Sequence, residues 1–177
     1  MNTCIHCKEA CQVIKGKPYH YTECGLDNVY IHGVNQYRCP KCGETAVEIP
    51  KVKDLHLLIG KDIVCKDGLL EGQEIRYLRK EIRLRSGEMA ELLSVDAATY
   101  SRWENSKKPI GEAEDKLLRL IYILNAENET GRLLHKGIRA LNVLKRYAPS
   151  KKKKEKIELT VADWMMLNKP LFGESGC

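Results

Sequence analysis

The sequence predicts an α+β chain in which a small β-rich domain precedes an all-α domain. Six of the eight cysteines lie within residues 1–49, together with short runs of alternating apolar residues that are typical of strands. From Gly72 onward, apolar residues recur at helical spacing instead. Aromatic residues make up only 6% of the chain and charged residues 31%, so any hydrophobic core is expected to be small.

The expected elements follow from the apolar spacing. Runs 28–32 and 45–49 alternate as strands, and Pro50 closes that region. A connecting helix is expected from about residue 51 to Asp67-Gly68, although Gly60 weakens it. Five further helices are expected at about 73–84, 87–93, 97–106, 112–125 and 131–147. The residues predicted to face inward on the second and fourth of these are Met89, Leu92, Leu93, Leu117, Leu120, Ile121 and Leu124.

These patterns divide the chain into four expected regions. They are the β-rich domain (residues 1–49), a helical linker (50–72), the helical domain (73–148), and a basic linker with a C-terminal tail (149–177). Within the last region, Thr160 is expected to cap a short segment. Trp164 and Met165 of that segment are expected to pack on the body of the protein or on a dimer mate.

Composition and the first residues bound the class of protein. The formal net charge of +6 is compatible with nucleic-acid binding without demanding it. No apolar run approaches the roughly 18 residues of a membrane span. The first residues resemble neither a signal peptide nor a transit segment, so a cytoplasmic protein without membrane contact is expected. Cysteines in that compartment are expected to be thiols or metal ligands rather than disulfides.

The strongest chemical motif is a pair of Cys-x-x-Cys knuckles, CIHC at residues 4–7 and CPKC at 39–42. Two residues between thiolates allow a tight turn to point both sulfurs at one ion, and two such turns complete a tetrahedral shell. We expect one structural Zn²⁺ per chain, held by Cys4, Cys7, Cys39 and Cys42. A closed shell has no open position for a catalytic water. Alternative ligands at single positions are Cys11, Cys24, His6, His20 and His32, whereas Cys65 and Cys177 are expected to take no part.

Residues 75–109 have the pattern of a DNA-binding helix-turn-helix, whose second helix enters the major groove. Asp96 suits the N-cap of that helix, and Tyr100 with Trp103 should be buried. Burial of these aromatic residues leaves the opposite face available to contact DNA. Arg102 is expected to bond guanine, and Ala97 and Ala98 to touch thymine methyl groups. The full predicted contact set is Ser86, Ala97, Ala98, Thr99, Ser101, Arg102, Asn105, Lys107 and Lys108.

The same segment resembles the Xre/Cro-type helix-turn-helix of phage repressors. In that family an arginine of the first helix pairs with a glutamate late in the DNA-contacting helix. The matching positions are Arg79 and Glu104, so the resemblance implies a structural ion pair between them with no base contact.

Adding the two knuckles narrows the resemblance to the MqsA family of antitoxins, which carry a YgiT-type zinc finger. It covers residues 1 to about 125 and includes the segments 70–79 and 108–120. It implies a homodimer that represses its own operon through palindromic double-stranded DNA. It also implies that the N-terminal zinc domain binds and silences a partner toxin.

The chain departs from this family at several positions. Ser94 stands where many members have glycine at the turn, and 85–86 (Arg-Ser) replaces the usual Thr-Gln opening of the second helix. Ala98 aligns with an asparagine that contacts bases in the MqsA antitoxin, so the operator sequence should differ. Arg102 matches the family's other base-contacting residue. The predicted helix 131–147, a candidate dimer contact, extends past the compact antitoxin.

Two other functions fit the sequence: a free-standing zinc-containing transcription factor without a toxin, and a protein–protein adaptor. A neighbouring reading frame for a small ribonuclease-like protein would favour the antitoxin. No Ser/His/Asp or carboxylate constellation is evident, so an enzyme is not expected.

Overall fold

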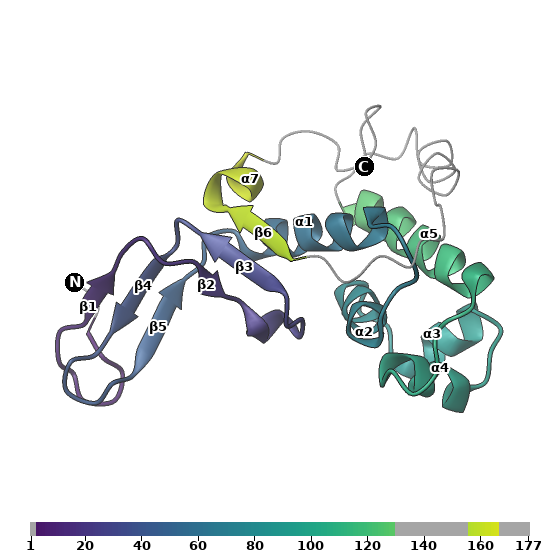
Figure 1. Cartoon of the computed structure of the whole chain (residues 1–177), viewed down its shortest axis with the longest axis horizontal. Coiled ribbons are helices and arrows are strands. Elements are labelled where there is room, and N and C mark those ends of the chain that lie inside the picture. Colours follow the sequence, from purple (N-terminus) through teal and green to yellow (C-terminus); the bar gives the residue numbers. More distant parts are fainter. Residues whose placement is uncertain (1–2, 130–155, 167–177) are drawn as a thin grey trace.

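The computed structural model describes residues 3–129 and 156–166 and confirms the α+β class (Figure 1). The strands gather at one end of an elongated arrangement, α2, α3 and α4 lie at the other, and α1 runs between them. None of the described helices combines the length and apolar character that a membrane crossing requires. The elements are β1 (Gln12–Ile14), β2 (Tyr19–His20), a 3-10 turn (Thr22–Cys24), β3 (Val29–His32), β4 (Asn35–Arg38), β5 (Thr45–Glu48), α1 (Val52–Cys65), α2 (Gly72–Glu81), α3 (Ser86–Leu92), α4 (Ala97–Glu104), α5 (Glu112–Glu129), β6 (Ile157–Thr160) and α7 (Val161–Met165).

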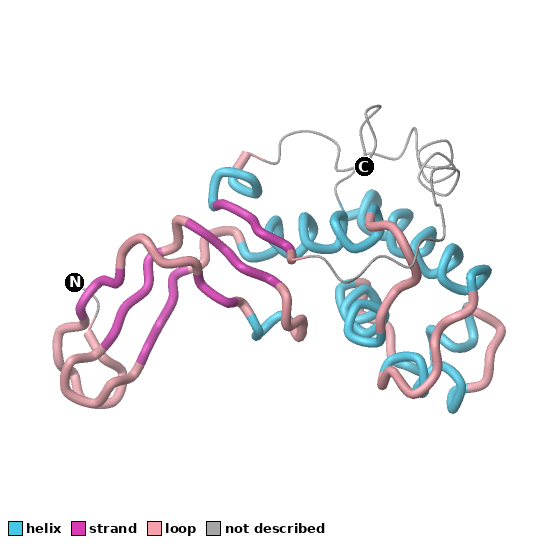
Figure 2. The backbone as a smooth tube through the Cα atoms, viewed as in Figure 1, coloured by secondary structure: helices cyan, strands magenta, loops and turns pink. Residues whose placement is uncertain are grey.

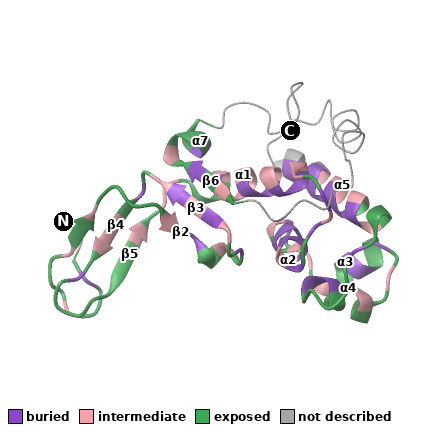
Figure 3. Cartoon of the chain, in the orientation of Figure 1, coloured by how far each residue is buried: buried purple, intermediate pink, exposed green. Residues whose placement is uncertain are grey.

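The strands form two three-stranded sheets with the orders β1-β4-β5 and β2-β3-β6 (Figure 2). The first sheet is antiparallel and exposes most of its side chains (Figure 3). In the second sheet, Val29 and Ile31 of β3 are completely buried and join the main hydrophobic core. The first sheet therefore has little apolar burial of its own, and its stability must come from another source.

Strand β6 is a finding that the sequence did not indicate. Residues 149–177 read as a linker and tail, yet Ile157–Thr160 pairs in parallel with β3, with Ile31 opposite Leu159. The amide of Thr160 donates to the Asp163 carboxylate at 2.6 Å and begins α7. Trp164 of α7 is completely buried, and its indole Nε1 donates to the carbonyl of Pro50 at 2.8 Å. This segment therefore joins β3 to the start of α1. Contacts between residues so far apart in the sequence cannot be predicted from local sequence patterns.

Gly60 in α1 has a packing role. A Cβ atom there would overlap the hydroxyl of Tyr122 on α5. The two helices approach closely at this point, and both residues are buried. The helix-weakening glycine noted in the sequence is thus the site where α5 meets α1.

Arg119 and Asp115, one turn apart on α5, form a buried ion pair. The Arg119 Nε donates to Asp115 Oδ2 at 2.8 Å, and the two side chains are 1% and 0% exposed. The same guanidinium donates to three carbonyls at and beyond the end of α1, those of Val64, Lys66 and Gly68. Asp115 also accepts the amide of Leu70 at 2.7 Å. The pair satisfies backbone groups at a helix end, which cannot be left unpaired when buried.

With this pair buried, a different face of α5 points inward from the one predicted. Leu118, Tyr122 and Ile123 are buried beside it, whereas Leu117 is 39% exposed. On α3, Met89 and Leu93 are buried as predicted, but Leu92 is 53% exposed. The inward positions predicted for Leu117 and Leu92 are therefore wrong. On α4 the predicted burial of Tyr100 and Trp103 is confirmed, with their rings edge to face at 6.0 Å between centroids.

The predicted helix at 131–147, the basic run at 151–154 and Cys177 lie outside the described residues.

Replacing Trp164 with alanine tests whether the C-terminal segment is part of the folded core. Trp164→Ala is expected to destabilise the protein by about 3–5 kcal/mol, because a large buried side chain and its bond to Pro50 are lost. Urea unfolding measures this. The neighbouring Met166→Ala, at a residue 76% exposed, should change stability by less than about 0.5 kcal/mol. Equal, small effects of both variants would show that the segment does not contribute to the core.

Candidate metal centre and nucleic-acid interface

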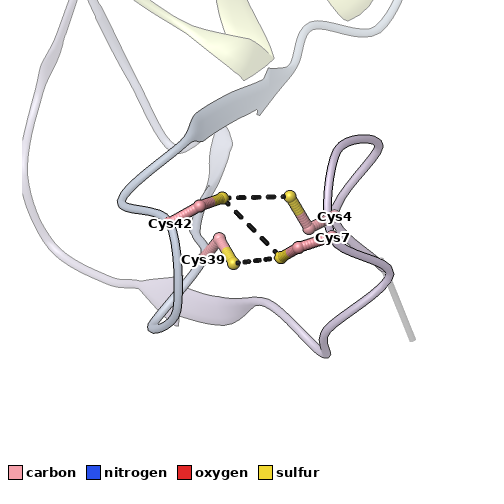
Figure 4. A group of neighbouring side chains, drawn as sticks. All are labelled: Cys4, Cys7, Cys39 and Cys42. Atoms are coloured by element: carbon pink, nitrogen blue, oxygen red, sulfur yellow. Dashed lines mark hydrogen bonds between the residues drawn. The ribbon is translucent and has the colours of Figure 1, made fainter.

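Both cysteine knuckles have the same backbone form. The amide of Lys8 donates to the carbonyl of Cys4, and the amide of Gly43 donates to that of Cys39, both at 3.0 Å. The residue after each knuckle takes the left-handed conformation, with φ of 60° at Lys8 and 76° at Gly43. Only glycine adopts this conformation without a steric penalty, which accounts for Gly43. The two turns are thus built alike and face each other across the end of the first sheet (Figure 4).

The four knuckle sulfurs form one cluster. Cys4 Sγ lies 3.4 Å from Cys42 Sγ, Cys7 Sγ lies 3.4 Å from Cys39 Sγ, and Cys7 Sγ lies 3.7 Å from Cys42 Sγ. All four sulfurs lie within 4.8 Å of one another. A tetrahedron of thiolates around Zn²⁺, with bonds of 2.3 Å, has edges of about 3.8 Å. The cluster therefore has the donor set and the size that such an ion requires.

Ionisation of the cluster depends on the surrounding amides. The amide of Cys42 is the main reason that the pKa of Cys39 falls to about 6. The amide of Cys7 likewise lowers the pKa of Cys4. The Glu44 amide favours the Cys42 thiolate, but hydrogen bonds with Cys39 and Cys4 raise its pKa to about 12. The backbone thus stabilises some thiolates, while four together repel one another unless a cation compensates the charge.

None of the alternative ligands belongs to the group of four sulfurs. Within the described residues, this is the one group of three or more cysteine, histidine or acidic residues with the proximity to hold a metal ion. Cys24 donates to the carbonyl of Tyr21 instead, and the ring of His20 bonds the carbonyl of Asp27. Cys11 is a free thiol outside the group, whereas Cys65 is disulfide-bonded, so the expectation of thiols is wrong at that position.

Helices α3 and α4 pack against each other across a tight turn. Ala90, 2% exposed, lies inside the pair, and its carbonyl accepts the amide of Val95 at 2.9 Å. Ser94 at the turn has a φ of 54°, the left-handed conformation that a non-glycine residue adopts only at a steric cost. Asp96 caps α4 by accepting the amide of Thr99 at 2.7 Å. Hydrogen bonds to Thr99 lower the pKa of Asp96, so the cap stays charged at neutral pH.

The predicted DNA-contacting residues lie on one side of this pair and the loop after it. Seven are exposed, and Thr99 and Ser86 are half-buried; the exposed ones are Ala97, Ala98, Ser101, Arg102, Asn105, Lys107 and Lys108. Asn105 is already engaged, because it donates to the carbonyl of Ser101 at 2.7 Å and accepts from Arg76 at 2.8 Å. Arg76 on α2 therefore belongs to this surface, although no sequence motif indicated it. Arg76 precedes Arg79 by three residues, which places both side chains on the same face of the helix, and this spacing could have indicated Arg76 from the sequence.

Arg79 and Glu104 form an ion pair behind the exposed surface. Arg79 Nε donates to Glu104 Oε1 at 2.6 Å and Nη2 to Oε2 at 3.2 Å, a two-pronged geometry. The side chains are 13% and 8% exposed. The hydrogen bond to Glu104 raises the pKa of Arg79, and Arg79 also donates to the carbonyl of Leu84. The pair joins the end of α4 to α2 and to the loop before α3, so its position is structural.

Comparison with known proteins identifies the family of the chain. A family model described as MqsA, the antitoxin component of bacterial toxin-antitoxin systems, matches residues 1–153. No curated protein and no solved structure gives a significant match.

Removing one partner of the Arg79–Glu104 pair tests its structural role. Glu104→Ala is expected to cost about 3 kcal/mol, because it leaves the Arg79 charge largely buried and unpaired. The measurement is urea unfolding, with Glu91→Ala on the exposed side of α3 as the matched control. The control should change stability by less than about 0.5 kcal/mol. A loss below about 1 kcal/mol for Glu104→Ala would remove the pair from the scaffold.

Proposed function

Because the chain belongs to the MqsA antitoxin family, we propose that it is an antitoxin that represses its own toxin–antitoxin operon by binding DNA. The observation that carries this proposal is the pairing of two features in one chain. A four-cysteine cluster lies at one end, and the exposed surface of α4 lies on a helix pair at the other. The protein acts by binding rather than by catalysis.

Helix α4 is the DNA-contacting helix of this proposal. Its inner side is occupied by Tyr100, Trp103 and Glu104, so its outer side alone is available to the major groove. Arg102 is the residue there that can form two bonds to guanine, and the methyl groups of Ala97 and Ala98 suit thymine. Lys107 and Lys108 lie in the loop directly after α4, and they are proposed to contact phosphates beside the groove that α4 enters.

We propose that the chain binds a palindromic operator as a homodimer. One α4 contacts only a few base pairs, and two copies related by a twofold axis double the contacts and the specificity. The N-terminal domain, residues 1–49, is assigned the binding of the partner toxin in the cytoplasm. This assignment rests on the family and on the distance of that domain from α4 along the molecule (Figure 1).

The four cysteines are proposed to hold one structural Zn²⁺. The ion supplies four bonds that tie the two knuckles together and adds no redox chemistry. The exposed first sheet has few buried side chains, so these bonds replace a hydrophobic core. Zinc accordingly stabilises the toxin-binding domain and takes no direct part in DNA contact.

Metal analysis of the purified protein tests the zinc proposal. About one zinc ion per chain is expected in the native protein, and Cys39→Ser should reduce it strongly because a buried ligand is lost. Chelation should unfold the first sheet. Cys24→Ser, whose sulfur bonds the Tyr21 carbonyl outside the cluster, is the matched control and should retain the metal. Native protein with little zinc, or Cys39→Ser with a full complement, would refute the site.

Binding to the protein's own promoter tests the DNA proposal. Arg102→Ala should weaken cognate binding by about 1–3 kcal/mol and relax preference at one base pair in each half-site. Lys108→Ala should weaken binding to all duplexes and reduce the salt dependence by about one phosphate contact. Arg38→Ala, an exposed arginine of β4, is the matched control and should change neither. Unchanged base preference in Arg102→Ala would exclude Arg102 from base contact.

A further inference from the structure

A cavity of about 180 Å³ lies where the start of α1, the end of α2 and the last described turns of α5 meet. None of its lining residues belongs to the cysteine cluster or to α4. Its apolar wall comes from Leu57, Ile82, Ala126 and the ring of Tyr122. A cavity of roughly 150 Å³ with apolar walls accommodates a benzene ring, so this one has room for a single ring.

The rim of the cavity carries an excess of positive charge. Lys53, Lys80 and Arg83 line it, and Glu81 is the one carboxylate in the lining. The three cations are exposed, and none of them has an ion pair within the described part of the chain. Glu81 is directed to His56, whose Nδ1 lies 2.9 Å from Glu81 Oε1. The formal charge of these four groups is therefore +2, which matches a dianion.

We propose that this cavity binds a small molecule with a ring-sized apolar body and a doubly negative head, of the phosphate monoester class. The body lies against Leu57, Ile82 and Ala126, and the head lies among Lys53, Lys80 and Arg83. A phosphate monoester is predominantly a dianion at neutral pH because its second pKa is about 6.

The position of the cavity connects both halves of the protein. His56 in its wall bonds Glu81 of α2 through Nδ1 and the hydroxyl of Tyr21, beside the second sheet, through Nε2 at 2.8 Å. The carbonyl of His56 also accepts the hydroxyl of Tyr77 on α2 at 2.9 Å. A ligand in the cavity contacts α1, α2 and α5 at the same time, next to these hydrogen bonds. Ligand binding therefore stabilises the junction between the sheets and the helices.

Calorimetric titration of the full chain with phenyl phosphate tests the proposal. The expected result is saturable binding at a stoichiometry of about one, with a Kd below about 1 mM and a raised Tm. Inorganic phosphate tests the head alone and phenol the body alone, and each should bind at least about tenfold more weakly. Absence of saturation with phenyl phosphate overturns the proposal, as does equal binding of inorganic phosphate.

Two variants locate the binding. Lys80→Gln combined with Arg83→Gln should weaken phenyl phosphate binding at least about tenfold, while Lys15→Gln combined with Lys17→Gln, a matched pair of exposed lysines between β1 and β2, should not. Val52→Trp, at a lining residue 42% exposed, obstructs the cavity without removing a charge and should also abolish binding. It decides the matter if the double variant does not fold. Binding that survives Val52→Trp overturns the site.

The DNA proposal is separable from this result. Suppose that the native protein does not bind phenyl phosphate and that the Lys80/Arg83 variant loses affinity for the promoter. These cations then contact DNA, and the cavity proposal is wrong. If phenyl phosphate binds as expected while promoter binding is absent, the cavity stands without the DNA proposal.

Discussion

The buried ion pair between Arg119 and Asp115 is the constraint on which the arrangement of the helices depends. The guanidinium of Arg119 carries five hydrogen-bond donors, so it must keep its partners once it is buried. Those partners are one carboxylate on its own helix and three carbonyls at the end of α1. Asp115 also accepts the amide of Leu70, so the segment that leads from α1 into α2 is held against α5. The orientation of α2, and through the Arg79–Glu104 pair that of α4, follows from it.

Features with short-range causes could be predicted from the sequence. The knuckles at 4–7 and 39–42, the cap at Asp96 and the left-handed Ser94 each depend on a few neighbouring residues. The burial of Tyr100 and Trp103 follows from helical spacing. The predicted site residues likewise lie in the two places that the motifs indicated, the sulfur cluster and the exposed side of α4, and their roles in binding stay predictions.

Features with long-range causes could not be predicted. Apolar spacing predicted that Leu117 faces inward, but the buried pair Arg119–Asp115 occupies the inner face of α5 instead. Apolar spacing assumes that inward-facing residues are apolar, and a buried charged pair does not meet that assumption. Strand β6 depends on pairing with β3 across more than a hundred residues. The Thr160 cap and the packing of Trp164 were predicted from the sequence, but the partner of the indole, the carbonyl of Pro50, was not. The junction of Tyr21, His56 and Glu81 joins three elements that have no common motif.

Together these contacts describe a protein with two separate ends that helix α1 joins. The cysteine cluster organises a sheet with almost no core, and α4 presents a surface whose back is fixed by buried charges. Helix α1, fastened by Trp164, Tyr122 and Arg119, joins the two. The proposed contact between α4 and specific DNA, made by a symmetric dimer, can be measured by footprinting of the protein on its own upstream region. We expect one protected site with two inverted half-sites about one helical turn apart. Protection of no defined site, or uniform protection of unrelated DNA, would contradict it.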